Sequence, residues 1–154
     1  IDVDYRQALT FLPHWARGVQ VFANASAIRQ SGVNLGGVAF AGFIPRIYNW
    51  GISLTRPKFN VRVNWNYRGQ QRLNAVTNAG TEPGTFRYAR PRTYVDVLGE
   101  YQFSRRLALF MNLRNLNDAT EDFETYGPNT PAYARLRNIT DFHSLWTFGI
   151  KGRF

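Results

Sequence analysis

The sequence WTFGIKGRF at residues 146–154 alternates apolar and polar side chains and ends on an aromatic residue. Successive side chains of a β-strand lie on opposite faces, so the aromatic and aliphatic residues share one face and the hydroxyl and basic residues share the other. An apolar face suits lipid and a polar face suits water, which is typical of a strand in an outer-membrane β-barrel. A soluble sheet seldom leaves such a strand unpaired, whereas a closed barrel pairs it on both sides.

The composition excludes membrane-spanning helices and thiol chemistry. The longest stretch without a charged residue is 30–45, and glycine and proline interrupt it. A transmembrane helix needs ~20 mostly apolar residues, but a barrel strand needs only ~9–11. There is no cysteine, so a disulfide scaffold and a thiolate metal site are excluded. Residue 1 is isoleucine and no signal peptide is evident, so we expect residues 1–154 to be the carboxy-terminal part of a longer protein.

The chain carries a net charge of +9, from 17 arginines, two lysines and ten acidic residues. A basic protein raises the possibility of nucleic-acid binding. The arginines are spread along the chain instead of forming a basic run or a helix stripe, which argues against a nucleic-acid partner. We interpret them mainly as solvated charges of a lumen and a rim. Binding of anionic ligands or lipopolysaccharide phosphates is the remaining interpretation.

Seven segments have the two-residue period of strands. The clearest is 59–68, where Phe59, Val61 and Val63 begin an unbroken alternation with polar residues. The alternation is imperfect at Phe22, Ile28, Leu98 and Phe110, which fall out of phase with the apolar residues around them. The predicted strands are 1–11, 19–27, 48–55, 59–68, 93–103, 107–114 and 146–154.

The connections between these strands alternate in length. Short turns at 13–17, 56–58 and 104–106 alternate with long links near 30–45, 69–91 and 118–142. Short and long connections therefore fall at opposite ends of the strands. Outer-membrane barrels have this asymmetry, with short periplasmic turns and long extracellular loops.

Aromatic residues support the same orientation, because they gather at two levels of the predicted sheet. One level holds Tyr48, Trp50, Trp65, Tyr67 and Trp146, and the other holds Phe11, Phe59, Phe103 and Phe154. The eight steps from residue 146 to residue 154 give a height of ~20 Å at a tilt of ~40°, close to the ~25 Å apolar band of such barrels. Two aromatic girdles are typical of a membrane barrel. The sequence therefore predicts an all-β fold, a transmembrane antiparallel β-barrel segment of about seven strands.

Several stretches resemble one family. The run YQF at 101–103, followed by LALFMNLRNLND at 107–118, is similar to the penultimate hairpin of TonB-dependent outer-membrane receptors. Residues 7–13 with 17–18, and residues 50–54 with 66–69, are similar to earlier hairpins of those barrels. The family barrel has 22 strands, and the resemblance implies that this chain holds the last seven, as the carboxy-terminal part of the barrel domain without its plug.

The resemblance implies an active importer of a scarce nutrient of the siderophore-iron, vitamin B12 or glycan class, located in the bacterial outer membrane. Its implied partners are outer-membrane lipid and lipopolysaccharide, the barrel-assembly machinery, a small-molecule ligand, and an amino-terminal plug that contacts TonB. Polar side chains on the inner face would contact the plug or line the ligand route, although hydration of the lumen is the simpler role for most of them. They are Asn60, Arg62, Asn64, Arg68, Asp96, Glu100, Asn112 and Arg114.

The final strand also resembles the signal that the barrel-assembly machinery recognises. Phe148, Gly149, Ile150 and Phe154 stand in the expected places. Gly152 departs from the pattern, because a large apolar residue usually stands there. In the last long link, Tyr126 and Tyr133 are the expected ligand contacts, since loops on a rigid scaffold carry recognition.

Catalysis is not expected. Asp96 and Glu100 lie on one face, but four strand residues place them ~13 Å apart, beyond the ~5–9.5 Å of paired catalytic carboxyls. Asp141, His143 and Ser144 are close in sequence, yet neighbouring strand residues point to opposite faces and do not converge as a triad requires. We expect no enzyme activity and no cofactor.

A metal site is not expected either. His14 and His143 stand alone in the sequence without a second ligand at metal-binding spacing. Glu121, Asp122 and Glu124 offer oxygen ligands for calcium, but solvated loop charge is the simpler interpretation. Two other classes stay open beside the receptor. One is a free-standing small outer-membrane barrel with a structural or porin-like role, which needs an even strand number. The other is a soluble binding module.

Overall fold

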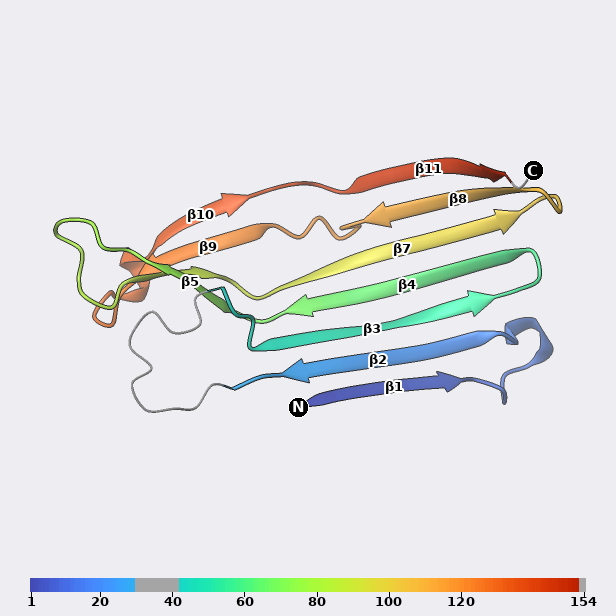
Figure 1. Cartoon of the computed structure of the whole chain (residues 1–154), viewed down its shortest axis with the longest axis horizontal. Helices are drawn as coiled ribbons and strands as arrows, with labels where there is room; N and C mark the ends of the chain where they lie inside the picture. Colours follow the sequence, from blue (N-terminus) through green and yellow to red (C-terminus); the bar gives the residue numbers. More distant parts are fainter. Residues whose placement is uncertain (30–41, 153–154) are drawn as a thin grey trace.

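The computed structural model describes residues 1–29 and 42–152 and shows an all-β chain with antiparallel sheets. The main sheet has seven strands in the order β1-β2-β3-β4-β7-β8-β11, which lie side by side in Figure 1. No helix in the described part has the length and apolar content needed to cross a membrane. The strand bounds are β1 Asp2–Ala8, β2 Val19–Ala27, β3 Arg46–Thr55, β4 Phe59–Arg68, β7 Arg92–Gln102, β8 Leu107–Arg114 and β11 Leu145–Gly152.

All seven predicted strands are confirmed, and their ends agree with the sequence pattern to within a few residues. The predicted short turns are also present, and the first contains the 3₁₀ helix η1 (His14–Ala16). These turns lie together at one end of the sheet, on the right in Figure 1, and the long links leave the other end. Among the described residues the sheet is open, with β1 and β11 at its edges.

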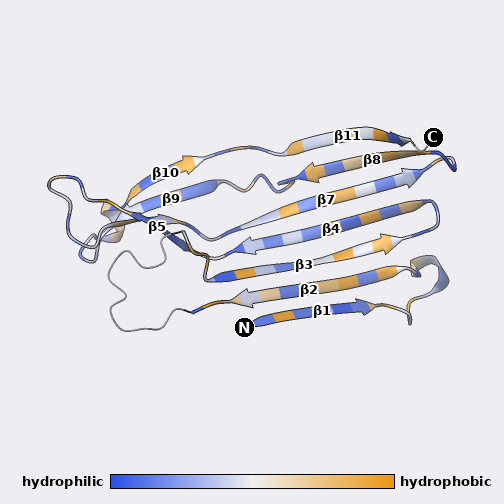
Figure 2. Cartoon of the chain, in the orientation of Figure 1, coloured by the Kyte–Doolittle hydropathy of each residue, from blue (hydrophilic) through white to orange (hydrophobic). Residues whose placement is uncertain are grey.

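The strand register keeps apolar residues in rows that cross the sheet. Ile52 of β3 pairs with Val63 of β4, Val63 pairs with Val97 of β7, and Val97 pairs with Leu113 of β8. Two residues closer to the long-link end of the same strands, Trp50 and Trp65 stack with ring centroids 6.5 Å apart. Since side chains alternate along each strand, one face is apolar and the other polar, and hydropathy alternates along the arrows in Figure 2.

No second layer covers the apolar face in the described part of the chain. Phe148 is 65% exposed and Ile150 is 67% exposed, and no large side chain there is fully buried. The sheet is therefore held by backbone hydrogen bonds and by contacts between neighbouring side chains on its surface. It has no packed interior of its own.

Two phenylalanines break the alternation because they cover glycines on the polar face. Phe22 lies directly opposite Gly51, and Phe110 lies directly opposite Gly149. A Cβ atom on either glycine would meet the facing ring at 2.4 Å, so each ring fills the space that the glycine leaves. A cation lies over each ring, 4.1 Å from the centroid for Arg62 on Phe22 and 5.4 Å for Lys151 on Phe110. Such rings shield their glycines and fix the strand register.

The long links contain four strands that the sequence pattern did not predict. They are β5 Gln71–Ala75, β6 Phe86–Ala89, β9 Glu121–Tyr126 and β10 Leu136–Thr140, in the sheet order β10-β9-β6-β5. β6 comes from the link between β4 and β7, and it pairs with β9 from the link between β8 and β11. This second sheet extends past the long-link end of the main sheet (Figure 1).

Gly51 provides a test of the register contacts. Gly51→Ala is expected to lower the free energy of unfolding by about 1–3 kcal/mol, because the new Cβ meets the Val63 carbonyl oxygen at 2.3 Å and the Phe22 ring at 2.4 Å. Ser53→Ala, on the same face of the same strand, is the matched control. Urea titration of both variants measures the difference, and equal stability of the two variants would contradict the proposed close contact.

Candidate functional site

The eight polar side chains that the sequence assigned to an inner surface lie on the polar face. Asn60 pairs with Glu100 and Asn64 pairs with Asp96 across β4 and β7, and the register places the other four on the same side. Whether they contact a plug or a ligand stays a prediction. Most of them line two hollows on this face, one near the second sheet and one near the short turns.

The hollow near the second sheet has a volume of about 740 Å³, and its lining includes Asp96. Its carboxylate accepts hydrogen bonds from Asn66 Nδ2 at 2.9 Å and from the Asn115 backbone N–H at 3.0 Å. Arg68 and Arg114 also line it, and neither forms an ion pair with a described residue. Asp96 offsets one of the two arginine charges and engages the neutral donors, so Arg68 and Arg114 are the groups of this hollow that offer donors to an anionic ligand or one rich in acceptors.

Asn115 holds the shape of this hollow, and sequence reasoning gave it no role. Its φ is +53°, a conformation that asparagine adopts more readily than most residues. The side chain is buried and donates to the Ala119 and His143 carbonyl oxygens at 3.1 and 3.2 Å, and it accepts from the Ala119 N–H at 2.8 Å. Asn115 thereby holds together two segments, the one that leaves β8 for the second sheet and the one that returns from it to β11. The sequence feature that could have pointed to Asn115 is its position at the end of the run MNLRN, residues 111–115.

The hollow near the short turns is smaller, about 350 Å³, and two of its charged side chains, Glu100 and Lys151, pair with each other. Lys151 Nζ lies 2.5 Å from Glu100 Oε2, and Arg62 Nε donates to Asn64 Oδ1 at 2.9 Å. Asn60 and Asn112 complete its polar lining. This arrangement indicates a structural role for these side chains within the face.

The carboxylates considered for calcium each pair with arginine. Glu121 lies 2.6 Å from Arg92, and Asp122 pairs with Arg137 and lies 3.7 Å from Arg90. Glu124 lies 3.5 Å from Arg90 and 3.9 Å from Arg135. Their oxygens are therefore engaged by guanidinium groups, which argues against a calcium cage at these residues. They are not simply solvated loop charges either, because Asp122 joins β9 to β10 and Glu121 joins β9 to β7 of the main sheet.

The two tyrosines expected to contact a ligand differ in their surroundings. Tyr126 stacks on Tyr88 with centroids 4.2 Å apart, and its hydroxyl accepts from Gln70 Nε2 at 3.1 Å. Tyr133, in the 3₁₀ helix η2 (Ala132–Ala134), is 92% exposed. Tyr126 is thus part of the packing of the second sheet, while Tyr133 has a free surface. Ligand contact stays a prediction for both.

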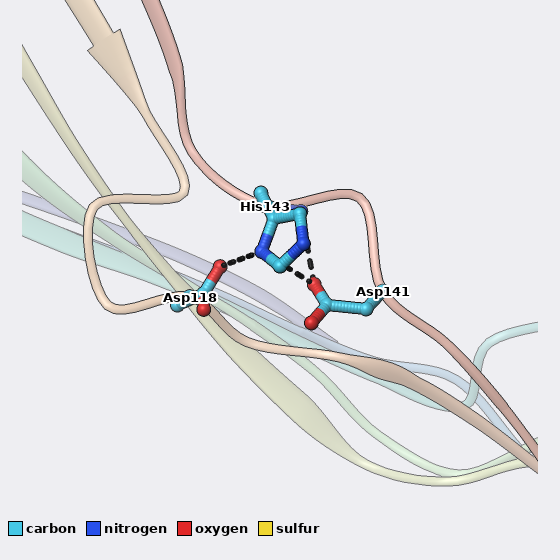
Figure 3. Close-up of side chains that lie close together, drawn as sticks. All are labelled: Asp118, Asp141 and His143. Atoms are coloured by element: carbon cyan, nitrogen blue, oxygen red, sulfur yellow. Dashed lines mark hydrogen bonds and ion pairs between the residues drawn. The ribbon is translucent and has the colours of Figure 1, made fainter.

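His143 is not isolated, contrary to the expectation from sequence. Its Nδ1 lies 3.3 Å from Asp118 Oδ1 and 3.4 Å from Asp141 Oδ1, as Figure 3 shows. Asp118 belongs to the link after β8 and the other two to the link before β11, so the topology brings them together. All three side chains are exposed, and the backbone N–H of His143 also donates to Asp141. The geometry ties the two connections together at the junction of the sheets.

The residues of the expected assembly signal divide between the faces of β11. Phe148 and Ile150 lie on the apolar face, opposite Met111 and Leu109. Gly149 lies on the polar face under Phe110. Phe154 falls outside the described residues. Recognition of this strand by an assembly machinery stays a prediction.

The pairing of Asp122 with Arg137 can be tested by titration. The hydrogen bond from Arg137 holds the pKa of Asp122 below its usual range, so the ionised carboxylate stabilises the fold above pH ~4 and this contribution is lost as pH falls through the lowered pKa. Arg137→Gln is expected to raise that pKa toward the usual value. NMR titration of the Asp122 carboxyl carbon measures it. Arg135→Gln is the matched control, because Arg135 pairs with Glu124, and an equal rise in both variants would refute a specific Arg137 contact.

Comparison of the chain with family models, with curated proteins and with solved structures gives no match. The functional argument therefore rests on the geometry of the sheet. Its main elements are an uncovered apolar face, a polar face with an arginine-lined hollow, and a second sheet at one end.

Proposed function

We propose that this chain is wall of an outer-membrane β-barrel, in a TonB-dependent receptor that imports a scarce nutrient of the siderophore-iron, vitamin B12 or glycan class. The observation that carries the proposal is the seven-stranded antiparallel sheet with one apolar and one polar face. Lipid covers the apolar face in this arrangement. The polar face then lines the lumen.

The exposed apolar face supports a lipid environment. Trp146, Phe148 and Ile150 are each more than half exposed, and they continue the rows of β8 and β7 across the sheet. Soluble monomers rarely leave a contiguous apolar surface of this kind uncovered, because its hydration costs about 25 cal/mol per Å². A soluble binding module would need a further layer over the whole face.

The aromatic residues support the same placement. At the long-link end, Tyr48 stacks on Tyr67 with centroids 5.3 Å apart, beside the Trp50–Trp65 pair. At the other end, Phe59 pairs with Tyr101. Aromatic belts at two levels fit the two interfaces of a bilayer, where the rings have one apolar side and one wet side.

The receptor form of the proposal rests on the family resemblance, with support from the links. A barrel of the porin-like alternative needs an even number of strands, whereas the described main sheet has seven and leaves both edges unpaired. A receptor of this class also needs an extracellular surface that contacts ligand. The second sheet, built from two long links, supplies a rigid support for such a surface, with Tyr133 exposed on it.

Spin labelling along β4 tests the membrane placement. The chain has no cysteine, so single cysteine variants accept a nitroxide at one position only. In native outer membranes, labels at Val61, Val63 and Trp65 are expected to collide with oxygen, which concentrates in lipid, and labels at Asn60, Arg62 and Asn64 with a water-soluble nickel chelate. Collision rates from power saturation measure both. Absence of this two-residue period would overturn the membrane proposal.

Fractionation tests the receptor form separately. An antibody against residues 118–142 is expected to detect a band in the outer membrane with a mass far above 17.7 kDa, because plug and remaining barrel add to this segment. A membrane band near 17.7 kDa would favour an independent small barrel instead. A soluble band would contradict both forms.

A further inference from the structure

The two ends of the main sheet differ sharply in charge. None of the ten acidic residues lies in the short connections, which span 9–18, 56–58 and 103–106. The basic residues there are Arg17, Arg56, Lys58, Arg105 and Arg106. We call the surface formed by these five cations the short-turn rim. The second sheet at the other end has acidic and basic residues that pair with one another.

Most cations of the short-turn rim have no acidic partner. Arg17, Lys58, Arg105 and Arg106 form no ion pair with a residue of the described part. Arg56 donates to backbone carbonyl oxygens of the neighbouring turn. Glu100, which lines a hollow together with Arg105 and Arg106, already pairs with Lys151. The rim therefore presents uncompensated positive charge, which attracts anions strongly at low ionic strength.

An apolar hollow of about 620 Å³ lies on the apolar face next to this rim. Gly99 and Met111 are part of its lining, and the Met111 side chain covers Gly99 so closely that a Cβ there would meet Met111 Cε at 2.9 Å. Phe59, Leu109 and Phe148 form part of its walls. Lys58 directly precedes Phe59, and its carbonyl oxygen accepts from the Gln102 N–H at 2.6 Å, which joins the two turns that border the hollow.

We infer that the short-turn rim and this hollow form a binding site for an anionic phospholipid of the leaflet that the rim faces. The phosphate contacts Lys58, Arg105 and Arg106, and an acyl chain lies in the hollow between Phe59, Leu109 and Phe148. Charge complementarity selects the headgroup, and the adjoining apolar hollow selects a lipid over a free anion. The inference rests on the proposed membrane placement, and it adds a lipid preference that the barrel form does not require.

The test compares two spin-labelled lipids at the surface of the full-length protein. The purified protein is reconstituted in vesicles of phosphatidylcholine or of equal parts phosphatidylcholine and phosphatidylglycerol, and electron spin resonance measures how strongly each labelled lipid associates. We expect phosphatidylglycerol to be favoured roughly three- to tenfold at low salt, with the preference falling as salt screens the contact. The triple variant Lys58→Gln, Arg105→Gln, Arg106→Gln is expected to lose most of it.

A matched variant removes the same charge at the opposite end. Arg29→Gln, Arg46→Gln, Arg135→Gln replaces three exposed arginines outside the rim and is expected to keep the preference. Equal association of both lipids with the unaltered protein would overturn the inference, and so would an equal loss in both triple variants. Failure of the protein to insert into either vesicle would instead overturn the proposed function, and the lipid site with it.

The hollow is tested by Gly99→Leu, which narrows it, because the new side chain meets Met111 and pushes it into the hollow. This variant is expected to lower the number of immobilised chains for both lipids while the preference for phosphatidylglycerol remains. An unchanged number of immobilised chains would exclude the hollow as the acyl-chain site. Retained preference in the same variant also shows that the sheet has kept its fold.

Discussion

The rest of the structure depends on the register of the seven paired strands. Because side chains alternate with a period of two, a slip of one residue in any strand would move its whole apolar set to the polar face. The sheet has no packed interior that would resist such a slip. Local contacts hold the register instead. Two of them are the Phe22–Gly51 and Phe110–Gly149 pairs. A third is the pair of hydrogen bonds that Asp96 accepts from two neighbouring elements.

The main sheet was predictable because its strands are long and each carries its own alternation. Residues 59–68 decide their structure without reference to any other segment, and the short turn at 56–58 joins them to the preceding strand. The second sheet was not predictable in this way. β6 has four residues and pairs with β9, which starts more than 30 residues later, so its stability comes from a distant partner that a local pattern does not reveal.

The candidate site, like the fold, was predictable from the sequence only in part. Which polar side chains share a face follows from counting along the strands, and the register agrees at each of the eight positions. Which of them meet in a hollow depends on neighbours across strands, and so does the neutralisation of Glu121, Asp122 and Glu124 by arginines. His143 shows the same limit, because Asp141 is close to it in sequence but Asp118 lies 25 residues earlier, at the far end of the same long link.

The pairing of β6 with β9 has a consequence for variation among homologous chains. Surface links that stand alone vary freely in length, since each insertion affects only its own segment. Here two links share a ladder of hydrogen bonds, so a residue inserted in one shifts its register against the other. These links should therefore change length and sequence together during evolution. Grafting a new surface onto this scaffold would require exchanging both of them as a unit.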